Sequence, residues 1–471
     1  MASVDVVGSE LSQASPFWRA VSGARNGFPA GPWHWTPLGM TAALRSDPLG
    51  YYTTAFKTFG DIVGFHVGPL RSLFIAHPDH IKHVLQDNNH NYEKGLVIAK
   101  LKVLIGDGLF SSEGDFWRRQ RRLAQPAFHR KRLGGFVATM TDATQAMLDR
   151  WEAVARGAAP LDVAAEMTRL TLGIVGRTLF SRNLDDAADA VGCTLGEVLA
   201  LMNERTMRFI ATPLWWPTPF TRRLARGIHE LDRVVFGIIE TRRRTDEAHE
   251  DLLDMLLRAR DEDTGEGMTD RQLRDEVMTF LLAGHETTAV ALSWTWYLLA
   301  RHPQVAERLR AEVATALGGR TPTLEDLPRL QYARMVVEET MRLYPPVWGF
   351  FRQALGPDRL GEYTVPKGTL LFISPYITHR HPRVWEDPER FDPERFAPER
   401  VRERPRFAYL PFSGGPRLCI GNEFALMEAQ LAVAMTLQRY RLELVAGARV
   451  EPESRLTLRP RGGMAMRVAA A

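Results

Sequence analysis

Residues 411–430 read PFSGGPRLCIGNEFALMEAQ, and this segment decides the fold. Cys419 lies between a glycine-rich loop and an amphipathic helix that is predicted to begin directly after it. Glycines such as Gly421 allow tight backbone turns where larger side chains would collide with a ligand. A thiol at the start of a helix meets free N–H groups that stabilise a thiolate. The segment therefore predicts a thiolate that is presented to a bound group.

The cysteine count narrows the choice of that group. The chain has 2 cysteines, Cys193 and Cys419, which excludes a disulfide scaffold and fits a reducing cytoplasm. A structural zinc site needs four ligands, and no C-x-x-C pair is present. A single thiolate suits the axial position of haem iron. A buried, inert cysteine is the alternative interpretation.

The composition is that of an ordinary globular protein. Of the 471 residues 45% are hydrophobic and 25% are charged, which excludes disorder and collagen-like repeats. The net charge of +4 is too small to indicate nucleic-acid binding. There is no apolar run of about 18 residues that would span a bilayer, and the first ten residues do not resemble a secretory signal. We therefore expect a cytoplasmic protein with no nucleic-acid partner and no membrane anchor.

Helical spacing dominates the chain from Trp117 to Tyr344. Residues 59–78 alternate and turn at Gly68-Pro69, which predicts a β-hairpin, and 368–377 contain a short apolar strand. Residues 440–445 and 455–468 read as strands, with a turn at Gly462-Gly463. No dinucleotide fingerprint or P-loop occurs. The predicted fold is mainly α with small β-sheets, in a single domain over 1–471 that begins with an N-terminal arm, 1–35.

The best-marked helix begins near Thr269, which forms a T-x-x-Q capping box, and ends near Arg301 before His302-Pro303. Its middle, 280–290, reads FLLAGHETTAV. The small Ala283 would let a flat, bulky group approach the backbone, and Thr287 can bond back to the Ala283 carbonyl. Glu286 could pass protons into an otherwise apolar site. Alanine at position 289 rules out the H-E-x-x-H zinc motif, and a core helix with a polar patch remains the alternative.

Phe412 to Gly421 match F-x-x-G-x-R-x-C-x-G and resemble the haem-binding signature of the cytochrome P-450 family. Four further motifs of that family occur in this chain, in the order in which the family has them: WRRQR at 117–121, AGHETT at 283–288, ETMR at 339–342 and FDPERF at 391–396. The resemblance implies the cytochrome P-450 fold, with haem b between the long central helix and the Cys-loop helix. It also implies a monooxygenase that uses O₂ and two externally supplied electrons on a lipophilic small molecule.

The resemblance assigns roles to individual residues. Cys419 is implied to be the axial thiolate ligand of the haem iron, and Thr287 with Glu286 the acid–alcohol pair that delivers protons. The other cofactor-binding residues implied are Phe412, Arg417, Trp117, Arg121, Arg352, Ala283, Gly284 and Gly421. A structural clamp under the haem loop is implied for Glu339, Arg342 and Arg395.

A lipophilic substrate is expected, with fatty acids first and terpenoids close behind. The pocket residues expected by the same resemblance are Phe110, Phe280, Ala283, Val347 and Leu456, the last in a terminal strand segment. Within the family the chain resembles the bacterial fatty-acid hydroxylase branch, which holds the substrate carboxylate with an Arg and a Tyr near its first hairpin. Arg71 and Phe74 occupy that region here, so the match to this anchor is imperfect. Residues 211–220, ATPLWWPTPF, resemble a lid between two central helices, with ordinary core as the alternative.

No reductase domain is readable, so a separate ferredoxin or flavodoxin with its reductase is expected to supply the electrons. Trp117 and Arg121 are expected to turn inward and Arg118, Arg119 and Arg122 to face water. The basic residues expected to attract an acidic donor are Arg118, Arg119, Arg122, Arg130, Lys131 and Arg132.

Three alternatives remain open. A haem-thiolate isomerase or dehydratase would need no reductant, and the intact Glu286-Thr287 pair argues against it. A non-catalytic haem-based sensor would be supported by a fused regulatory domain, and none is visible. His77, His80 and His83 have helical spacing that could bind a metal, although a surface helix is the preferred interpretation. The protein is expected to be a monomer.

Overall fold

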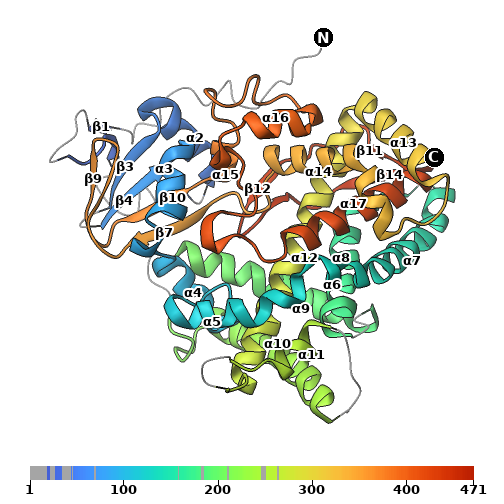
Figure 1. The fold of residues 1–471 in the computed structure, drawn as a ribbon, viewed down its shortest axis with the longest axis horizontal. Coiled ribbons are helices and arrows are strands. Elements are labelled where there is room, and N and C mark those ends of the chain that lie inside the picture. The colour runs from blue at the N-terminus through green and yellow to red at the C-terminus, as the bar shows by residue number, and fades with distance from the viewer. Residues whose placement is uncertain are drawn as a thin grey trace.

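The computed structural model describes residues 19–21, 27–33, 44, 46–67, 70–157, 159–181, 185–208, 212–244, 251–261 and 265–471. Most of the expected N-terminal arm and the predicted turn at Gly68-Pro69 lie outside these residues. The largest sheet lies on one side of the molecule, and most of the long helices lie on the other (Figure 1). The mainly α fold with small sheets is therefore confirmed.

The helices are longest between Trp117 and Tyr344, as the spacing predicts. Those of seven or more residues are α2 (Pro48–Phe59), α4 (Gly95–Ile105), α5 (Gly114–Ala124), α7 (Val137–Arg156), α8 (Val163–Phe180), α9 (Asp185–Met207), α10 (Pro219–Arg244), α11 (Leu252–Arg258), α12 (Asp270–Arg301), α13 (Pro303–Leu317), α14 (Gln331–Leu343) and α17 (Asn422–Arg439). The shorter ones are α3 (Pro78–Lys82), α6 (Arg130–Leu133), α15 (Pro375–Thr378) and α16 (Pro398–Glu403).

Within the described residues the strands form four small sheets. The largest has the order β1 (Arg19–Val21), β2 (Gly31–Trp33), β3 (Ile62–Val67), β4 (Leu70–Ile75), β10 (Leu370–Ile373), β7 (Phe350–Ala354) and β5 (Tyr92–Glu93). A second has the order β11 (Tyr440–Leu444), β14 (Ala465–Ala470) and β6 (Leu161–Asp162). The remaining two are β12 (Pro452–Ser454) with β13 (Leu458–Pro460), and β8 (Asp358–Leu360) with β9 (Tyr363–Val365).

Two strand predictions have different outcomes. β3 and β4 pair antiparallel with Ile62 opposite Ile75, so the predicted hairpin is confirmed. The chain also turns at Gly462-Gly463, where both glycines have positive φ. The strands on either side of this turn do not pair with each other, because β13 pairs with β12 whereas β14 pairs with β11 and β6. Sequence alternation identifies strands but not their partners.

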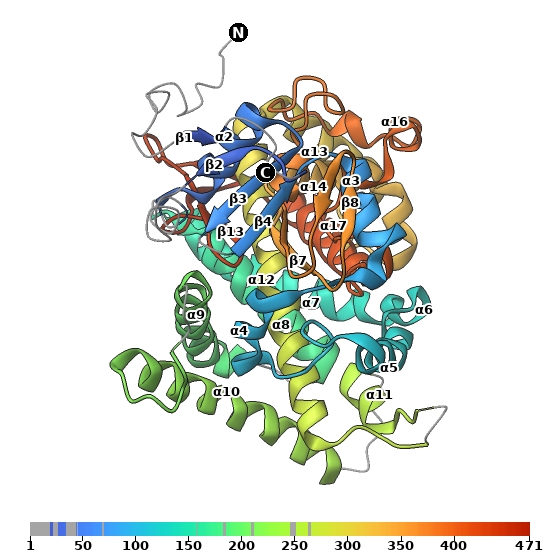
Figure 2. The same ribbon diagram turned by 90° about the vertical axis from the view of Figure 1, so that its left-hand side faces the viewer.

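Helix α12 is the axis of the helical part and runs through the middle of the molecule (Figure 2). Thr269 and Gln272 form the predicted capping box, in which the Gln272 N–H donates to Thr269 Oγ at 3.2 Å. The 32 residues of α12 span about 48 Å. Most residues of this helix are buried because α8, α10, α14 and α17 pack along it.

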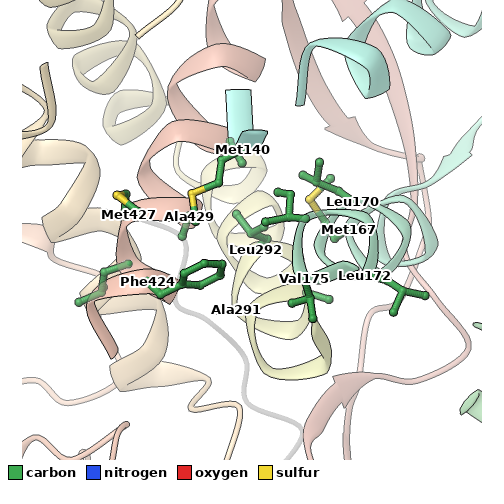
Figure 3. Close-up of a cluster of buried hydrophobic side chains, with 14 of the residues drawn as sticks. Met140, Met167, Leu170, Leu172, Val175, Ala291, Leu292, Phe424, Met427 and Ala429 are labelled. Carbon is green, nitrogen blue, oxygen red and sulfur yellow. The ribbon is translucent and has the colours of Figure 1, made fainter. Parts of the chain in front are cut away.

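The core beside α12 contains side chains from four helices (Figure 3). Met140 of α7, Met167 of α8, Leu292 of α12 and Met427 of α17 are all buried in it. Burial of each such side chain contributes about 1.5–3 kcal/mol. This packing fixes α12 against α17, and α17 begins directly after the cysteine loop.

Candidate functional site

A cavity of about 640 Å³ lies between the middle of α12, the region of α4 and the loop that carries Cys419. Its lining brings together residues from widely separated parts of the chain. It includes every predicted catalytic, cofactor and pocket residue: Phe110, Trp117, Arg121, Phe280, Ala283, Gly284, Glu286, Thr287, Val347, Arg352, Phe412, Arg417, Cys419, Gly421 and Leu456.

The cysteine loop is held by its own backbone. The Cys419 N–H donates to the Phe412 carbonyl at 2.9 Å, which closes the loop. Ser413 and Gly415 have positive φ values of 62° and 66°. A side chain on Gly415 would also clash with the carbonyl of Leu85, so glycine is required there. The loop thus fixes the cysteine immediately before α17.

The thiol of Cys419 has its accessible surface toward the cavity. Burial within the protein raises the pKa of the thiol. The backbone N–H of Gly421 and the positive charge of Arg121 act in the opposite direction and favour the thiolate. A bound cation would stabilise the thiolate further.

Cationic side chains gather at one end of the cavity. Arg417 donates to the Ser112 carbonyl at 2.9 Å and to the Glu113 carboxylate, and its guanidinium lies 3.7 Å from the ring centre of Trp117. Arg352 is buried, and burial lowers its pKa to about 10, with the charge of Arg417 contributing. Burial likewise lowers the pKa of Arg417 to about 10.

Lys94 completes this cationic cluster and was not identified from the sequence. Burial lowers its pKa well below the ordinary value, and the charges of Arg417 and Arg352 lower it further. Its ammonium donates to the Phe110 carbonyl, and its backbone N–H donates to Glu113 at 2.9 Å. Three cations therefore share the single carboxylate of Glu113, an arrangement that favours a bound dianion. Lys94 and Glu113 stand in loops whose local pattern carries no signal for this role.

The wall opposite the cysteine is formed by α12. Thr287 Oγ donates to the Ala283 carbonyl at 2.7 Å, as the sequence predicts. Glu286 lines the cavity, and its Oε1 accepts from Thr457 Oγ at 2.8 Å. A Cβ on Gly284 would lie 3.0 Å from Val175 Cγ2, so its small size also serves the packing of α8 against α12.

The apolar end of the cavity contains the predicted pocket residues, with one correction. Phe280 stacks on Phe128 with ring centres 5.5 Å apart, and Phe110 and Val347 line the cavity. Leu456 also lines it, but it stands in the turn between β12 and β13 and not in a strand. The turn that joins β12 to β13 therefore places Leu456 in the cavity lining.

Arg71 and Phe74, which match the carboxylate anchor imperfectly, do not line the cavity, and neither do the described residues of the stretch 211–220 that resembles a lid. The Arg71 guanidinium lies 5.8 Å from the ring centre of Phe28, and Phe74 is buried in the core of the large sheet. Trp215 and Trp216 stand between α9 and α10, the place expected for the lid, and are 76% and 54% exposed, so these two rings are not part of the core. Ala211, also in this stretch, lies outside the described residues.

The clamp residues stand apart from the cavity and are buried, Glu339 and Arg342 completely and Arg395 with 8% of its surface exposed. Arg342 donates to both oxygens of Glu339 at 2.6 and 2.8 Å, and to the carbonyls of His379, Pro388 and Arg390. Arg395 approaches Glu339 at 3.6 Å, which is an ion pair but too long for a hydrogen bond. Burial raises the pKa of Glu339, and the charge of Arg342 opposes that shift.

A surface groove adjoins the cavity on the side of α5. It is lined by Trp117, Arg118, Arg121, Arg122, Gln125, Pro126, His129 and Arg132. Arg118 is exposed, as expected. Arg119 does not simply face water, because it pairs with the buried Asp261 at 3.2 Å, and Arg122 pairs with the same carboxylate at 3.0 Å. The side chains of Arg130 and Lys131 lie outside the described residues.

The histidine cluster near α3 is not a metal site. Among the residues that the structure describes, no group of three His, Cys, Asp or Glu side chains is arranged to hold a metal ion. His83 Nε2 instead lies 2.9 Å from Asp358, and His77 caps α3 by accepting from the Asp79 N–H. None of the described helices combines the length and hydropathy that a membrane crossing requires.

A mainly helical fold with a cavity between a long central helix and a single-cysteine loop is typical of haem-thiolate proteins. The cytochrome P-450 family model matches residues 29–466. The chain belongs to the cytochrome P-450 family and is a monooxygenase of that family.

Relatives and a solved structure agree with this assignment. A cyclooctat-9-en-7-ol 5-monooxygenase from Streptomyces melanosporofaciens is 40% identical over 87% of this chain and 88% of its own length. A cyclooctatin synthase from the same organism is 36% identical over 90% of this chain and 92% of its own length. The crystal structure of the cytochrome P450DA haem domain superposes on this structure with a TM-score of 0.83, and the two sequences are 28% identical. The match covers 90% of this chain and 93% of the P450DA chain.

Proposed function

We propose that the cavity holds haem b with Cys419 as axial ligand, and that the protein hydroxylates a neutral, lipophilic, terpenoid-like molecule. The observation that carries the cofactor proposal is the pairing of one cavity-facing thiol with a cationic cluster. A haem that is held by a thiolate and carries two propionates would use both features, and Lys94, Arg352 and Arg417 supply positive charge that Glu113 only partly balances. When bound, the haem supplies O₂ activation and oxygen insertion into a C–H bond.

The residues around the proposed cofactor have separate tasks. Arg121, whose Nη1 donates to the Leu418 carbonyl at 3.0 Å, supports the cysteine loop from the α5 side. Arg417 and Arg352 bind the propionates, and Phe412 excludes water beside the sulfur. Thr287 and Glu286 hold and move protons on the α12 side. Glu339, Arg342 and Arg395 brace the chain beneath the loop.

The substrate proposal rests on the cavity lining and on the relatives. Two cations of the lining that are remote from the cysteine already have partners within the protein. Lys100 Nζ donates to the carbonyls of Thr206 and Arg208 at 3.2 and 2.6 Å, and Arg208 forms an ion pair with Glu204. A fatty-acid carboxylate would have to compete with these contacts for the two cations, whereas a neutral ring compound would not. The relative named for cyclooctat-9-en-7-ol acts, by its name, on a cyclic alcohol, which supports a terpenoid-like substrate.

An optical titration of the purified ferric protein tests this proposal. Polycyclic terpene alcohols and fatty acids of matched carbon number are added separately. A compound that binds beside the proposed haem would give a spin-state shift in the optical spectrum, which we expect with the neutral ring compounds at lower concentration than with the acids. Equal or stronger shifts with the fatty acids would contradict the substrate proposal and leave the cofactor proposal intact.

Thr287→Ala is expected to keep the haem and to consume reductant while releasing hydrogen peroxide in place of product. The alanine lacks the hydroxyl that orders protons at the α12 wall, and positioned proton transfer contributes at least about a hundredfold to rates. Product per electron is therefore expected to fall about tenfold or more. The control is Thr295→Ala, since Thr295 makes the same back-bond, to the Ala291 carbonyl at 2.9 Å, outside the cavity. Unchanged coupling in the Thr287 variant would refute its role.

We propose that residues 1–471 form one haem domain in the cytoplasm and receive electrons from a separate acidic protein at the groove beside α5. The groove carries Arg118 and Arg132 at its surface and adjoins Trp117 and Arg121 of the cavity lining. Long-range attraction between exposed charges is screened by salt. The reduction rate with an acidic ferredoxin should therefore fall as ionic strength rises, and a rate independent of salt would contradict this docking site.

A further inference from the structure

His379 occupies a fully buried position between the clamp and the cysteine loop. It follows directly after α15, and its side chain is 0% exposed. Its Nδ1 lies 3.1 Å from the Arg342 carbonyl, while its Nε2 lies 2.9 Å from the backbone N–H of Leu410. Because a carbonyl can only accept and an N–H can only donate, these partners assign a neutral imidazole with its proton on Nδ1.

The hydrogen bond to Leu410 connects His379 to the loop that carries Cys419. The Leu410 carbonyl accepts from the Ser413 N–H at 3.1 Å, at the point where the chain turns with positive φ. The Phe412 carbonyl, within the same turn, accepts the Cys419 N–H at 2.9 Å. Leu410 also lines the cavity. The imidazole therefore fixes Leu410 at the start of this turn, and the Phe412 carbonyl in the same turn fixes Cys419.

The contact with Arg342 is reciprocal. The guanidinium of Arg342 donates to the His379 carbonyl at 2.9 Å, while the His379 ring donates to the Arg342 carbonyl. Arg342 is itself fixed by Glu339 at 2.6 Å. The ring of Tyr409 covers the imidazole with ring centres 5.2 Å apart, and the Tyr409 hydroxyl donates to the Glu338 carbonyl of α14. The imidazole thus joins α14 rigidly to the loop.

We infer that His379 is a positioning residue that transmits the rigidity of the Glu339–Arg342 clamp to the Cys419 loop, through its Nε2 acceptor for the Leu410 N–H. This inference rests on the proposed role of Cys419 as the haem ligand. His379 is not itself among the residues that line the cavity, and it acts through the backbone of the lining residue Leu410. Loss of the acceptor would leave a buried N–H without a partner and loosen the turn.

The electrostatic surroundings support the neutral form. Burial lowers the pKa of His379 well below its ordinary value, and the charges of Arg342 and Arg380 lower it further. From the loop side it faces the Tyr409 ring and the Leu410 N–H. A histidine whose folded pKa is depressed stabilises the fold fully above the unfolded pKa of about 6.5, and this contribution is lost as the pH falls below that value.

Two amide variants separate the acceptor from the rest of the side chain. The Gln amide reaches the position of Nε2 and can still accept from Leu410, whereas the shorter Asn amide reaches only the position of Nδ1 and bonds Arg342. The matched control is His381→Asn, because His381 is also buried and hydrogen bonds to Asp61 at 3.0 Å, away from the loop. The readout is the fraction of haem protein whose reduced carbon monoxide spectrum is of the thiolate type.

We expect the ratio of thiolate-type to other form to fall about tenfold in His379→Asn, equivalent to about 1.4 kcal/mol, and to change little in His379→Gln and His381→Asn. The wild type should lose the thiolate-type form on acidification below about pH 6.5, and His379→Gln should lose it less steeply.

Similar losses in the Gln and Asn variants, or an Asn variant that matches the wild type, would overturn the inference. If His379→Asn holds no haem, the Gln variant alone decides, and a tenfold loss there contradicts the acceptor role. A wild type without a thiolate-type spectrum would instead refute the proposed cofactor.

Discussion

Replacing Cys419 with serine is expected to abolish the thiolate-type reduced carbon monoxide spectrum and product formation together. The cavity-facing sulfur is the one group in the loop that can give a charged soft ligand, and a serine hydroxyl stays protonated and donates little electron density to iron. Loss of even an outer-shell partner of a metal ligand costs about 10- to 100-fold. We therefore expect activity to fall by more than about a hundredfold.

The matched control for this experiment is Cys193→Ser in α9, the other cysteine of the chain. It should leave the spectrum and the activity unchanged. Both variants are expressed with added haem precursor, and haem content is measured beside the spectrum. A Cys419→Ser protein with the wild-type spectrum would remove the basis of the proposed site.

Glu339→Ala is expected to destabilise the protein by about 3–5 kcal/mol and to give little haem-loaded material. The carboxylate accepts from Arg342 at 2.6 and 2.8 Å and from the Asp392 N–H at 2.9 Å, all within the interior. Its removal strands the guanidinium of Arg342, which is fully buried. An unpaired buried charge costs far more than the ion pair itself contributes.

The measurement is the free energy of unfolding in denaturant, together with haem content after purification. Glu307→Ala serves as the control, because Glu307 pairs with Arg310 at 2.6 Å on the surface, where an ion pair contributes about 0–1 kcal/mol. Normal haem content and an unfolding free energy equal to that of the Glu307 variant would contradict the clamp assignment.

Local sequence patterns predicted the elements that depend on neighbouring residues. The capping box of Thr269 with Gln272 set the start of α12, and the alternation over 59–78 predicted the β3–β4 hairpin. The back-bond of Thr287 to Ala283 also follows from helix geometry alone. The cysteine signature placed Cys419 at the start of a helix because glycine and helix signals stand next to each other in the chain.

Patterns failed where the partner of a residue is remote. Nothing next to Lys94 in the chain reveals that it packs beside Arg352 and Arg417, more than two hundred and fifty positions away. The pairing of β14 with β6, and the projection of Leu456 from the β12–β13 turn, likewise depend on distant strands. The pairing of Arg119 with Asp261 turned an expected surface cation into part of the packed structure.

The amino-acid sequence by itself determined that this chain has one distinctive thiol in a turn-and-helix setting, a long capped helix with a polar notch, and an E-x-x-R motif at 339–342. These features are local, because hydrogen bonds within a few residues produce them. Only the tertiary structure decided that cations from α5, β7 and the loops converge on one cavity, and that His379 links the clamp to the cysteine loop. Such contacts arise from packing between remote segments, which no local pattern encodes.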